Sequence, residues 1–433
     1  MNSFILAVAL ILSATLSARE LSLRQALELA QQHSFELKRA RAEADASSSS
    51  LKQARAGRLP TLSASATAAY NSFVPSMSLE IPPVLQISRE IGGNEMYQAD
   101  LSLSVPLYTG GRIGSGIRSA TAVRDYRLAL TEASLQSVLY QSRLAFLHLY
   151  RSESLLDAAA ASHKRALVIQ GDVISLLAAG AADSMDILEA NLNLTVAELN
   201  LKSARSLRRQ EEITLLLYLG LPVSDSLVLT DFPKESRRET FAPRVMEISK
   251  PELRAADASV TLSETLVRSS RSASLPSIAL FGGFSYGKPN RDFFNYGWSE
   301  NFTVGATMNW SFNIGNRTGH TVGAQRHRWL AAASERDRLA ERIDKQVRLS
   351  QENERLAWER YLIAQQRFAI SADNYRLATS RRKMGTLSAN RWLEIEAALR
   401  EAESAKAAAL ADYYIARTTF YYAVGKNLLE EGF

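Results

Sequence analysis

Two kinds of hydrophobic pattern alternate along the chain. At about residues 60–71, 97–107, 276–287 and 302–312, apolar and polar side chains alternate with a period of two, which predicts four β-strands. In Leu101–Leu107 ("LSLSVPL"), leucine and valine form one face and serine forms the other. Such strands fit a membrane-spanning sheet with one wet face. They fit a soluble, half-buried sheet equally well.

The other segments have the periodicity of long helices. Gly111 to about Leu177 contains no proline, and this predicts a helix about 100 Å long. Its apolar positions follow a 3,4 spacing that is typical of coiled-coil packing: Leu135, Val138, Leu139, Ser142, Ala145, Phe146 and Leu149. Ser22–Gly57 and Asp183–Leu219 each predict a helical segment of about half that length. Ser22 and Gln25 form a capping-box motif at the first start.

The whole pattern occurs twice. Three pairs of segments match in order: "RLPTL" (58–62) with "SLPSI" (274–278), "SVPLYTGGRIGSGI" (104–117) with "NWSFNIGNRTGHTV" (309–322), and "GAADSMDILEA" (180–190) with "GTLSANRWLEI" (385–395). The sequence therefore predicts a first repeat at 19–220, a linker at 221–247 and a second repeat at 248–433. Each repeat has a helix, two strands, a long helix, a glycine turn (near 180 and near 385) and another helix.

A glycine–arginine corner follows the second strand of each repeat. Its residues are Gly110, Gly111 and Arg112 in the first copy and Gly315 and Arg317 in the second. A phosphate-binding loop is disfavoured because "GRIGSG" lacks the G-x-G-x-x-G spacing and no Lys-Ser/Thr pair follows. Glycine instead permits the backbone angles with which a strand turns into a helix. We therefore interpret both corners as strand-to-helix junctions.

The N-terminus and the composition limit the class of protein. An apolar run followed by small residues predicts a signal peptide at residues 1–18. The chain has no cysteine, five scattered histidines and a net charge of +6 with the two signs interspersed. We therefore expect no metal site, no cofactor, no nucleic-acid partner and no enzyme activity, since no catalytic constellation is recognisable.

The sequence resembles the TolC family of outer-membrane channel proteins over essentially the whole mature chain. The resemblance is carried by Leu21–Asn71, "LSVPLYTGGRIGS" (103–115) and the two glycine turns, "AAGAADSMDILEANLNL" (178–194) and "RRKMGTLSANRWLEIEAAL" (381–399). It implies an α+β membrane protein in which three chains, each with four transmembrane strands, form a 12-stranded β-barrel. That barrel continues into a periplasmic α-helical barrel.

The resemblance also implies a function. The trimer would be a passive exit duct of a tripartite efflux pump or a type I secretion system in the outer membrane of a Gram-negative-type cell. Its partners would be outer-membrane lipid, a periplasmic adaptor (membrane fusion) protein and an inner-membrane pump of RND or ABC type. A non-channel periplasmic coiled-coil protein is the alternative. The cargo and the role of the Ser72–Met96 loop stay open.

The helix tips carry the candidate gate. Family members with a carboxylate gate have aspartates six and nine residues after the second tip glycine; here Arg391 and Glu394 occupy these positions. Arg391 could pair with Glu394 or with a neighbouring chain. The first tip has Asp186 and Glu189 at equivalent offsets. Asp183 and Ser388 occupy matching positions and are expected to be helix N-caps, and Asp186 would then only interact favourably with the helix dipole. The adaptor-docking positions that the resemblance implies are Gly180, Ala181, Gly385 and Thr386.

Overall fold

The computed structural model describes residues 19–81, 85–90, 93–230, 250–288, 296–312 and 314–430. The predicted signal peptide and residues 231–247 of the predicted linker lie outside this part of the chain. Two compact units are present. The sheet unit comprises Glu43–Leu128 and Arg254–Asp337, and the helical unit comprises the chain up to Ala42, Ala129–Leu253 and the chain from Arg338.

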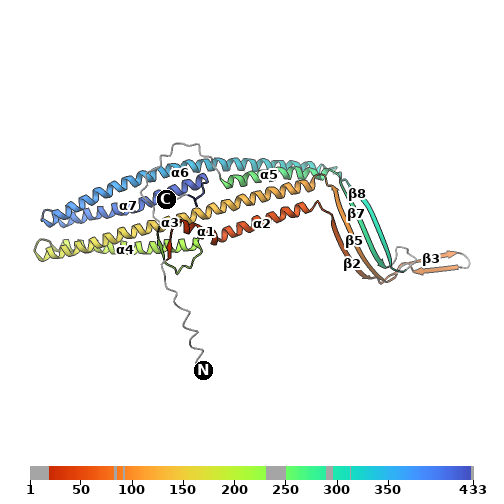
Figure 1. Ribbon diagram of the computed structural model, residues 1–433, viewed down its shortest axis with the longest axis horizontal. Helices are drawn as coiled ribbons and strands as arrows, with labels where there is room; N and C mark the ends of the chain where they lie inside the picture. Colours follow the sequence, from red (N-terminus) through yellow and green to blue (C-terminus); the bar gives the residue numbers. More distant parts are fainter. Residues whose placement is uncertain are drawn as a thin grey trace, which may run out of the picture. The chain divides into compact units, whose positions relative to one another are not determined.

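The sheet unit contains one four-stranded antiparallel sheet with the order β2-β5-β7-β8 (Figure 1). These strands span Thr61–Tyr70, Glu95–Tyr108, Ser277–Lys288 and Ser299–Asn309. The predicted strand at 302–312 is displaced, because β8 begins at Ser299 and ends at Asn309. Beyond it, the indole N–H of Trp310 donates to the carbonyl oxygen of Ser274 at 3.1 Å, so the chain leaves the sheet although the alternation continues.

The long helices repeat almost residue for residue. Helices α3 (Arg112–Ala178) and α6 (Arg317–Lys383) have 67 residues each, and α4 (Ser184–Leu219) and α7 (Ala389–Val424) have 36 each. Gly220 and Gly425 end α4 and α7 in left-handed conformations. These equal lengths and equal endings confirm the duplicated fold. A shorter helix, α5 (Pro251–Arg271), and a 3₁₀ turn (Ser272–Ser274) precede β7.

The helical segment predicted at Ser22–Gly57 is divided in two. Helix α1 (Leu23–His33) begins with the predicted capping box, in which the Ser22 hydroxyl accepts from the Gln25 N–H at 3.3 Å. The segment then breaks at Ser34, whose hydroxyl accepts from the N–H of Leu37 at 3.2 Å and so caps α2 (Phe35–Ala56). The sequence prediction missed this break because a serine within a helical pattern is compatible with both states.

The core of the helical unit contains the predicted seam. Val138, Leu139, Ala145, Phe146 and Leu149 are buried with residues of α1, α4 and α7, and Leu135 packs against them. Ser142, the small polar member of the seam, is fully buried. The 3,4 spacing thus identified the buried face of α3 correctly.

Two strand pairs were not predicted. Strands β1 (Arg19–Leu21) and β6 (Leu227–Leu229) pair in parallel and contribute leucines to the core. Strands β3 (Ser76–Ile81) and β4 (Leu85–Glu90) form a hairpin within the Ser72–Met96 loop.

A buried polar network links three helices of the helical unit. The carboxylate of Glu396 on α7 is fully buried and accepts from the Ser162 hydroxyl on α3 at 3.2 Å. The Arg400 guanidinium binds both Glu396 (3.0 Å) and the Asn193 side-chain oxygen on α4 (2.9 Å). Buried charges of this kind need partners with good geometry, so the network specifies how α3, α4 and α7 pack.

Candidate membrane face, junctions and helix tips

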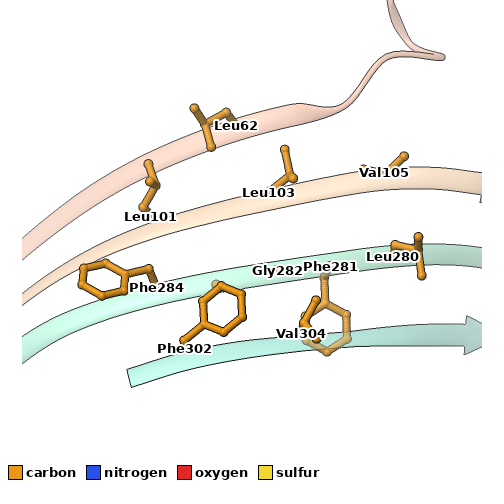
Figure 2. A pocket seen from close by; sticks show the side chains of 11 residues that line it. Leu62, Leu101, Leu103, Val105, Leu280, Phe281, Gly282, Phe284, Phe302 and Val304 are labelled. Atoms are coloured by element: carbon orange, nitrogen blue, oxygen red, sulfur yellow. The ribbon is translucent and has the colours of Figure 1, made fainter. Parts of the chain in front are cut away.

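One face of the four-stranded sheet is apolar across all four strands. The pairing register places Leu62 beside Leu103, Leu103 beside Gly282, and Gly282 beside Val304. Figure 2 shows the side chains around this row, which line a shallow hollow of about 420 Å³. Phe302 and Val304 are both 73% exposed, so the chain itself does not cover this face.

The opposite face is mainly polar. By register it carries Ser63, Ser65 and Thr67 of β2, Gln98, Asp100, Ser102 and Ser104 of β5, and Asn301, Thr303 and Thr307 of β8. Phe281 of β7 also borders the hollow in Figure 2, but by register with Ser104 and Gly305 it belongs to the polar face, where it is an exception. It packs over Gly305, where an added Cβ would lie only 2.7 Å from the Phe281 ring, so the missing side chain makes room for the ring.

Aromatic residues lie at both ends of the apolar face. At the start of β5, Trp298 stacks on Tyr286 (5.2 Å between centroids) and on Tyr97 (6.1 Å). At the other end, Trp310 packs against Phe312 at 4.5 Å. An apolar band between two aromatic girdles is the surface pattern of membrane-spanning sheets.

In the part of the chain that the structure describes, no helix combines the length and the apolarity that crossing a membrane requires.

The two strand-to-helix junctions use different residues for the same turn. Gly110 (φ +59°) and Gly111 (φ +81°) adopt left-handed conformations before α3. In the second copy Asn316 takes φ +50°, whereas Gly315 is not left-handed. Asparagine tolerates this region better than most residues. Arg112 and Arg317 are the exposed first residues of α3 and α6.

The two helix tips have equivalent turn geometry. Gly180 (φ +73°) and Gly385 (φ +72°) are left-handed, and the following N–H bonds back to the preceding helix: Ala181 to Leu176 at 2.8 Å and Thr386 to Arg381 at 3.0 Å. These are the 6→1 bonds of a Schellman motif. Exposed Gly180, Ala181, Gly385 and Thr386 therefore form two similar turns in the helical unit.

The capping interpretation holds at the first tip. The Asp183 carboxylate accepts from the N–H groups of Met185 (2.8 Å) and Asp186 (2.9 Å), and the Asp186 carboxylate accepts from the Asp183 N–H (3.1 Å). Ser388 caps α7 in the same way, accepting from the N–H of Arg391 at 3.3 Å. Asp186 is thus the second partner of a capping box.

The remaining gate candidates differ in their surroundings. Arg391 and Glu394 form an exposed ion pair on α7 with an N–O distance of 2.6 Å, one of the two pairings that the sequence left open. Glu189 is half-buried on α4, and its Oε2 is buried without a hydrogen-bond partner among the described residues. Among the described residues, the Arg391 side chain thus pairs with Glu394.

Two further tip residues were missed by sequence reasoning. Trp392 is buried between the tips, where its indole N–H donates to the Thr379 hydroxyl at 3.1 Å. Arg382, at the end of α6, donates through Nη1 to the carbonyl oxygen of Leu387 at 2.9 Å. The only sequence signal was the basic run Arg381–Lys383, which also fits a cationic helix C-terminus.

Solved outer membrane channels have the same fold. The CmeC channel of Campylobacter jejuni superposes with a TM-score of 0.80 at 17% identity, over 93% of this chain and 85% of that chain. VceC of Vibrio cholerae gives a TM-score of 0.78 at 15% identity, over 94% and 96%. The open state of the Neisseria gonorrhoeae MtrE channel gives 0.78 at 17% identity, over 94% and 89%.

The sequence also matches a family. The outer membrane efflux protein family covers residues 26–221 and 243–426, so this chain belongs to the outer membrane efflux proteins. Both the resemblance to TolC-like channels and the duplicated α+β fold are therefore confirmed. A comparison with curated proteins gives no match.

Proposed function

We propose that three copies of this chain form one exit duct of a tripartite efflux pump or a type I secretion system. Family membership supports efflux across the outer membrane. Strands β2 and β8 end the sheet within one chain. Lipid does not tolerate unpaired strand edges, so β8 of one copy pairs with β2 of the next. Three copies with four strands each give a closed, 12-stranded barrel, within the size range of such barrels.

The continuous apolar face of the sheet is the observation that carries this proposal. Large side chains such as Leu62, Phe302 and Val304 are exposed there, opposite a face of serine, threonine and asparagine. In a barrel the apolar face contacts lipid and the polar face lines a wet interior. The strands are 10 to 14 residues long, which is enough to cross the membrane at a tilt.

The helical unit is the periplasmic part of the duct. Its tips at Gly180–Ala181 and Gly385–Thr386 are the docking surface for a periplasmic adaptor protein, and the adaptor connects the duct to an inner-membrane pump of RND or ABC type. The pump supplies the energy and the duct conducts passively, so the chain is not an enzyme. The cell is of Gram-negative type, with the sheet in its outer membrane.

A non-channel periplasmic coiled-coil protein would share the long helices and the export signal. An exposed apolar sheet face bounded by aromatic residues has no role in a protein of that class. Family membership likewise favours the duct over this alternative.

Reconstitution in planar lipid bilayers tests the duct. Purified full-length protein should elute as a trimer in detergent and produce discrete conductance steps. If it is monomeric and neither the wild type nor any tip variant conducts, the duct proposal is wrong.

The gate is tested in the same bilayers. We propose that the Arg391–Glu394 pair narrows the tip, so Arg391→Ala and Glu394→Ala should each raise single-channel conductance several-fold. Arg376→Ala is the matched control, because Arg376 forms an exposed i,i+3 ion pair with Asp373 on α6, away from the tip turn. Equal conductance in all variants would place the constriction elsewhere.

A further inference from the structure

The polar face of the four-stranded sheet carries a single charged side chain, that of Asp100. The charged residues of the four strands are Glu95, Asp100, Lys288 and Glu300. Asp100 shares the polar face with the serines of β5. The other three have the register of the apolar face, and each pairs directly with a tyrosine at the end of the sheet where Trp298 stacks. The sheet thus keeps every other charge of its strands off the polar face.

Asp100 lies in a row of uncharged polar residues. It pairs with Ser65 of β2 on one side and with Ser285 of β7 on the other, and Ser285 pairs with Asn301 of β8. The Oδ1 atom of Asp100 accepts from the side-chain amide of Gln98 at 2.8 Å. These neighbours are hydrogen-bonding groups without charge, so within the four strands nothing on this face neutralises the carboxylate.

Assembly of the proposed barrel adds no cation to this face. The barrel consists of the same four strands three times, so its inner surface is the polar face of one chain repeated. Across the seam, β2 pairs with β8 of the next copy, whose polar-face positions are serine, asparagine, threonine and glycine. Three Asp100 carboxylates therefore face one interior at one height, because symmetry-related residues lie at the same level along a threefold axis.

The interior is narrow enough for this ring of carboxylates to act on ions at its centre. Strands about 4.8 Å apart and tilted by about 40° give a 12-stranded barrel a backbone radius of about 12 Å. An inward-pointing aspartate side chain brings its charge within about 10 Å of the axis. The Debye length is also about 10 Å at 0.1 M ionic strength. The field of the ring therefore reaches the whole cross-section at moderate salt.

We propose that Asp100 makes the duct cation-selective where it crosses the outer membrane. This inference rests on the proposed trimeric duct. A ring of carboxylates selects cations because it raises their local concentration and lowers that of anions. At the second tip, by contrast, Arg391 and Glu394 balance each other as an ion pair. Positively charged solutes thus pass the barrel in preference to anions of the same size.

Reversal potentials in planar bilayers test this role. The purified full-length trimer separates KCl solutions of about 0.1 M and about 0.01 M, in which screening is weak. Wild type should pass K⁺ more readily than Cl⁻. Asp100→Asn should lower the K⁺/Cl⁻ permeability ratio at least about twofold, and Asp100→Lys should reverse the preference. Above about 1 M KCl, where the Debye length is about 3 Å, the variants should become indistinguishable from wild type.

Two further variants control for position and for folding. Glu300→Gln removes one negative charge from β8 next to Asn301, at nearly the height of Asp100 but on the apolar face, so its permeability ratio should equal that of wild type. Ser285→Asp leaves Asp100 in place and adds a second carboxylate to the same row, so it should raise the ratio. Each variant must elute as a trimer, and all are compared within one background, wild type or a conducting tip variant.

Two results would overturn the assignment of Asp100. The first is an equal permeability ratio in wild type, Asp100→Asn and Ser285→Asp. The second is a fall in Glu300→Gln as large as that in Asp100→Asn, which would show that the overall charge of the sheet acts rather than the ring. In both cases the trimer conducts, so the duct proposal stands. Absence of conductance in the wild type and in every tip variant would instead contradict the duct itself.

Discussion

Gly110 occupies the most constrained position of the first junction. Its φ is +59°, and an added Cβ would lie 2.8 Å from the Cβ of Leu275 and 2.9 Å from the carbonyl oxygen of Ser272. The next glycine, Gly111, is also left-handed but has open space around its Cβ position. The first junction therefore needs Gly110 for both its conformation and its close contact, and Gly111 only for its conformation.

Gly110→Ala should therefore lower the stability of the sheet unit by more than the roughly 1–2 kcal/mol that a left-handed alanine costs. Gly315→Ala is the matched control from the second copy, because Gly315 is not left-handed and has no neighbour within 4 Å of its Cβ position. Thermal unfolding of the purified trimer measures both. Equal melting temperatures for the two variants would contradict this account of the junction.

Glu212 binds the chain segment that follows α4 through a hydrogen bond. Its carboxylate accepts from the N–H of Leu227 at 2.8 Å and from Arg209 at 2.7 Å. Burial raises the pKa of Glu212, but the Leu227 N–H and the guanidinium groups of Arg209 and Arg208 outweigh it, so the net pKa is lowered. A lowered pKa in the folded state means that this carboxylate stabilises the fold above its unfolded pKa and loses that effect as pH falls through the folded value.

Glu212→Gln should therefore destabilise the protein by about 3 kcal/mol at neutral pH, because it breaks a buried, charge-assisted cluster. The difference in melting temperature from wild type should shrink as the pH is lowered below about 4.5. Glu211→Gln is the control, since Glu211 forms no ion pair within the described chain. A difference that stays constant with pH would show that Glu212 does not act through its charge.

At the scale of elements, the alternation of apolar and polar residues predicts which side chains share a face of the sheet. A period of two assigned Leu101, Leu103 and Val105 to one face of β5, and the structure places them with the apolar residues of β7 and β8. It did not determine where β8 ends, because Trp310 and Phe312 continue the alternation outside the strand. Those two residues gain contacts with Ser274 and with each other in place of strand pairing.

Single-cysteine variants test which face of the sheet contacts lipid. The chain has no native cysteine, so the introduced thiol is the one that is labelled. In native membranes, Ser102→Cys on the polar face should react with a water-soluble maleimide about tenfold faster than Leu103→Cys on the apolar face, because a thiol in apolar surroundings stays protonated. Denatured samples should label equally. Similar rates in the membrane would indicate a sheet that is wet on both faces.

The sequence predicted where helices end better than it predicted whether a helix runs without a break. Gly180, Gly385, Asp183 and Ser388 mark turns and caps that depend on a few neighbouring residues, and the structure shows each in that role. The break at Ser34 could not be predicted, because nothing in the local pattern separates a serine that caps a new helix from one within a helix. The short β1–β6 pair was missed because its two strands lie far apart in sequence.

At the scale of the whole molecule, both copies of the repeat contribute elements to the sheet unit and to the helical unit. Each copy contributes two strands to one sheet, and β5 of the first copy pairs with β7 of the second. The two copies differ in detail: Gly111 corresponds to Asn316, and among the described residues the β3–β4 hairpin occurs in the first copy. The equal helix lengths nevertheless give two similar tips, which suits a partner that contacts both.

The sequence by itself determined the repeats, the strand faces, the buried seam of α3 and the glycine turns, because each depends on residues close together along the chain. Only the tertiary structure decided the strand order β2-β5-β7-β8, the pairing of Arg391 with Glu394 and the uncharged neighbours of Asp100. Strand order is nonlocal, since a period of two specifies which way a side chain faces but not which strand lies beside it. The role of a charged side chain likewise depends on which partners the fold brings within reach.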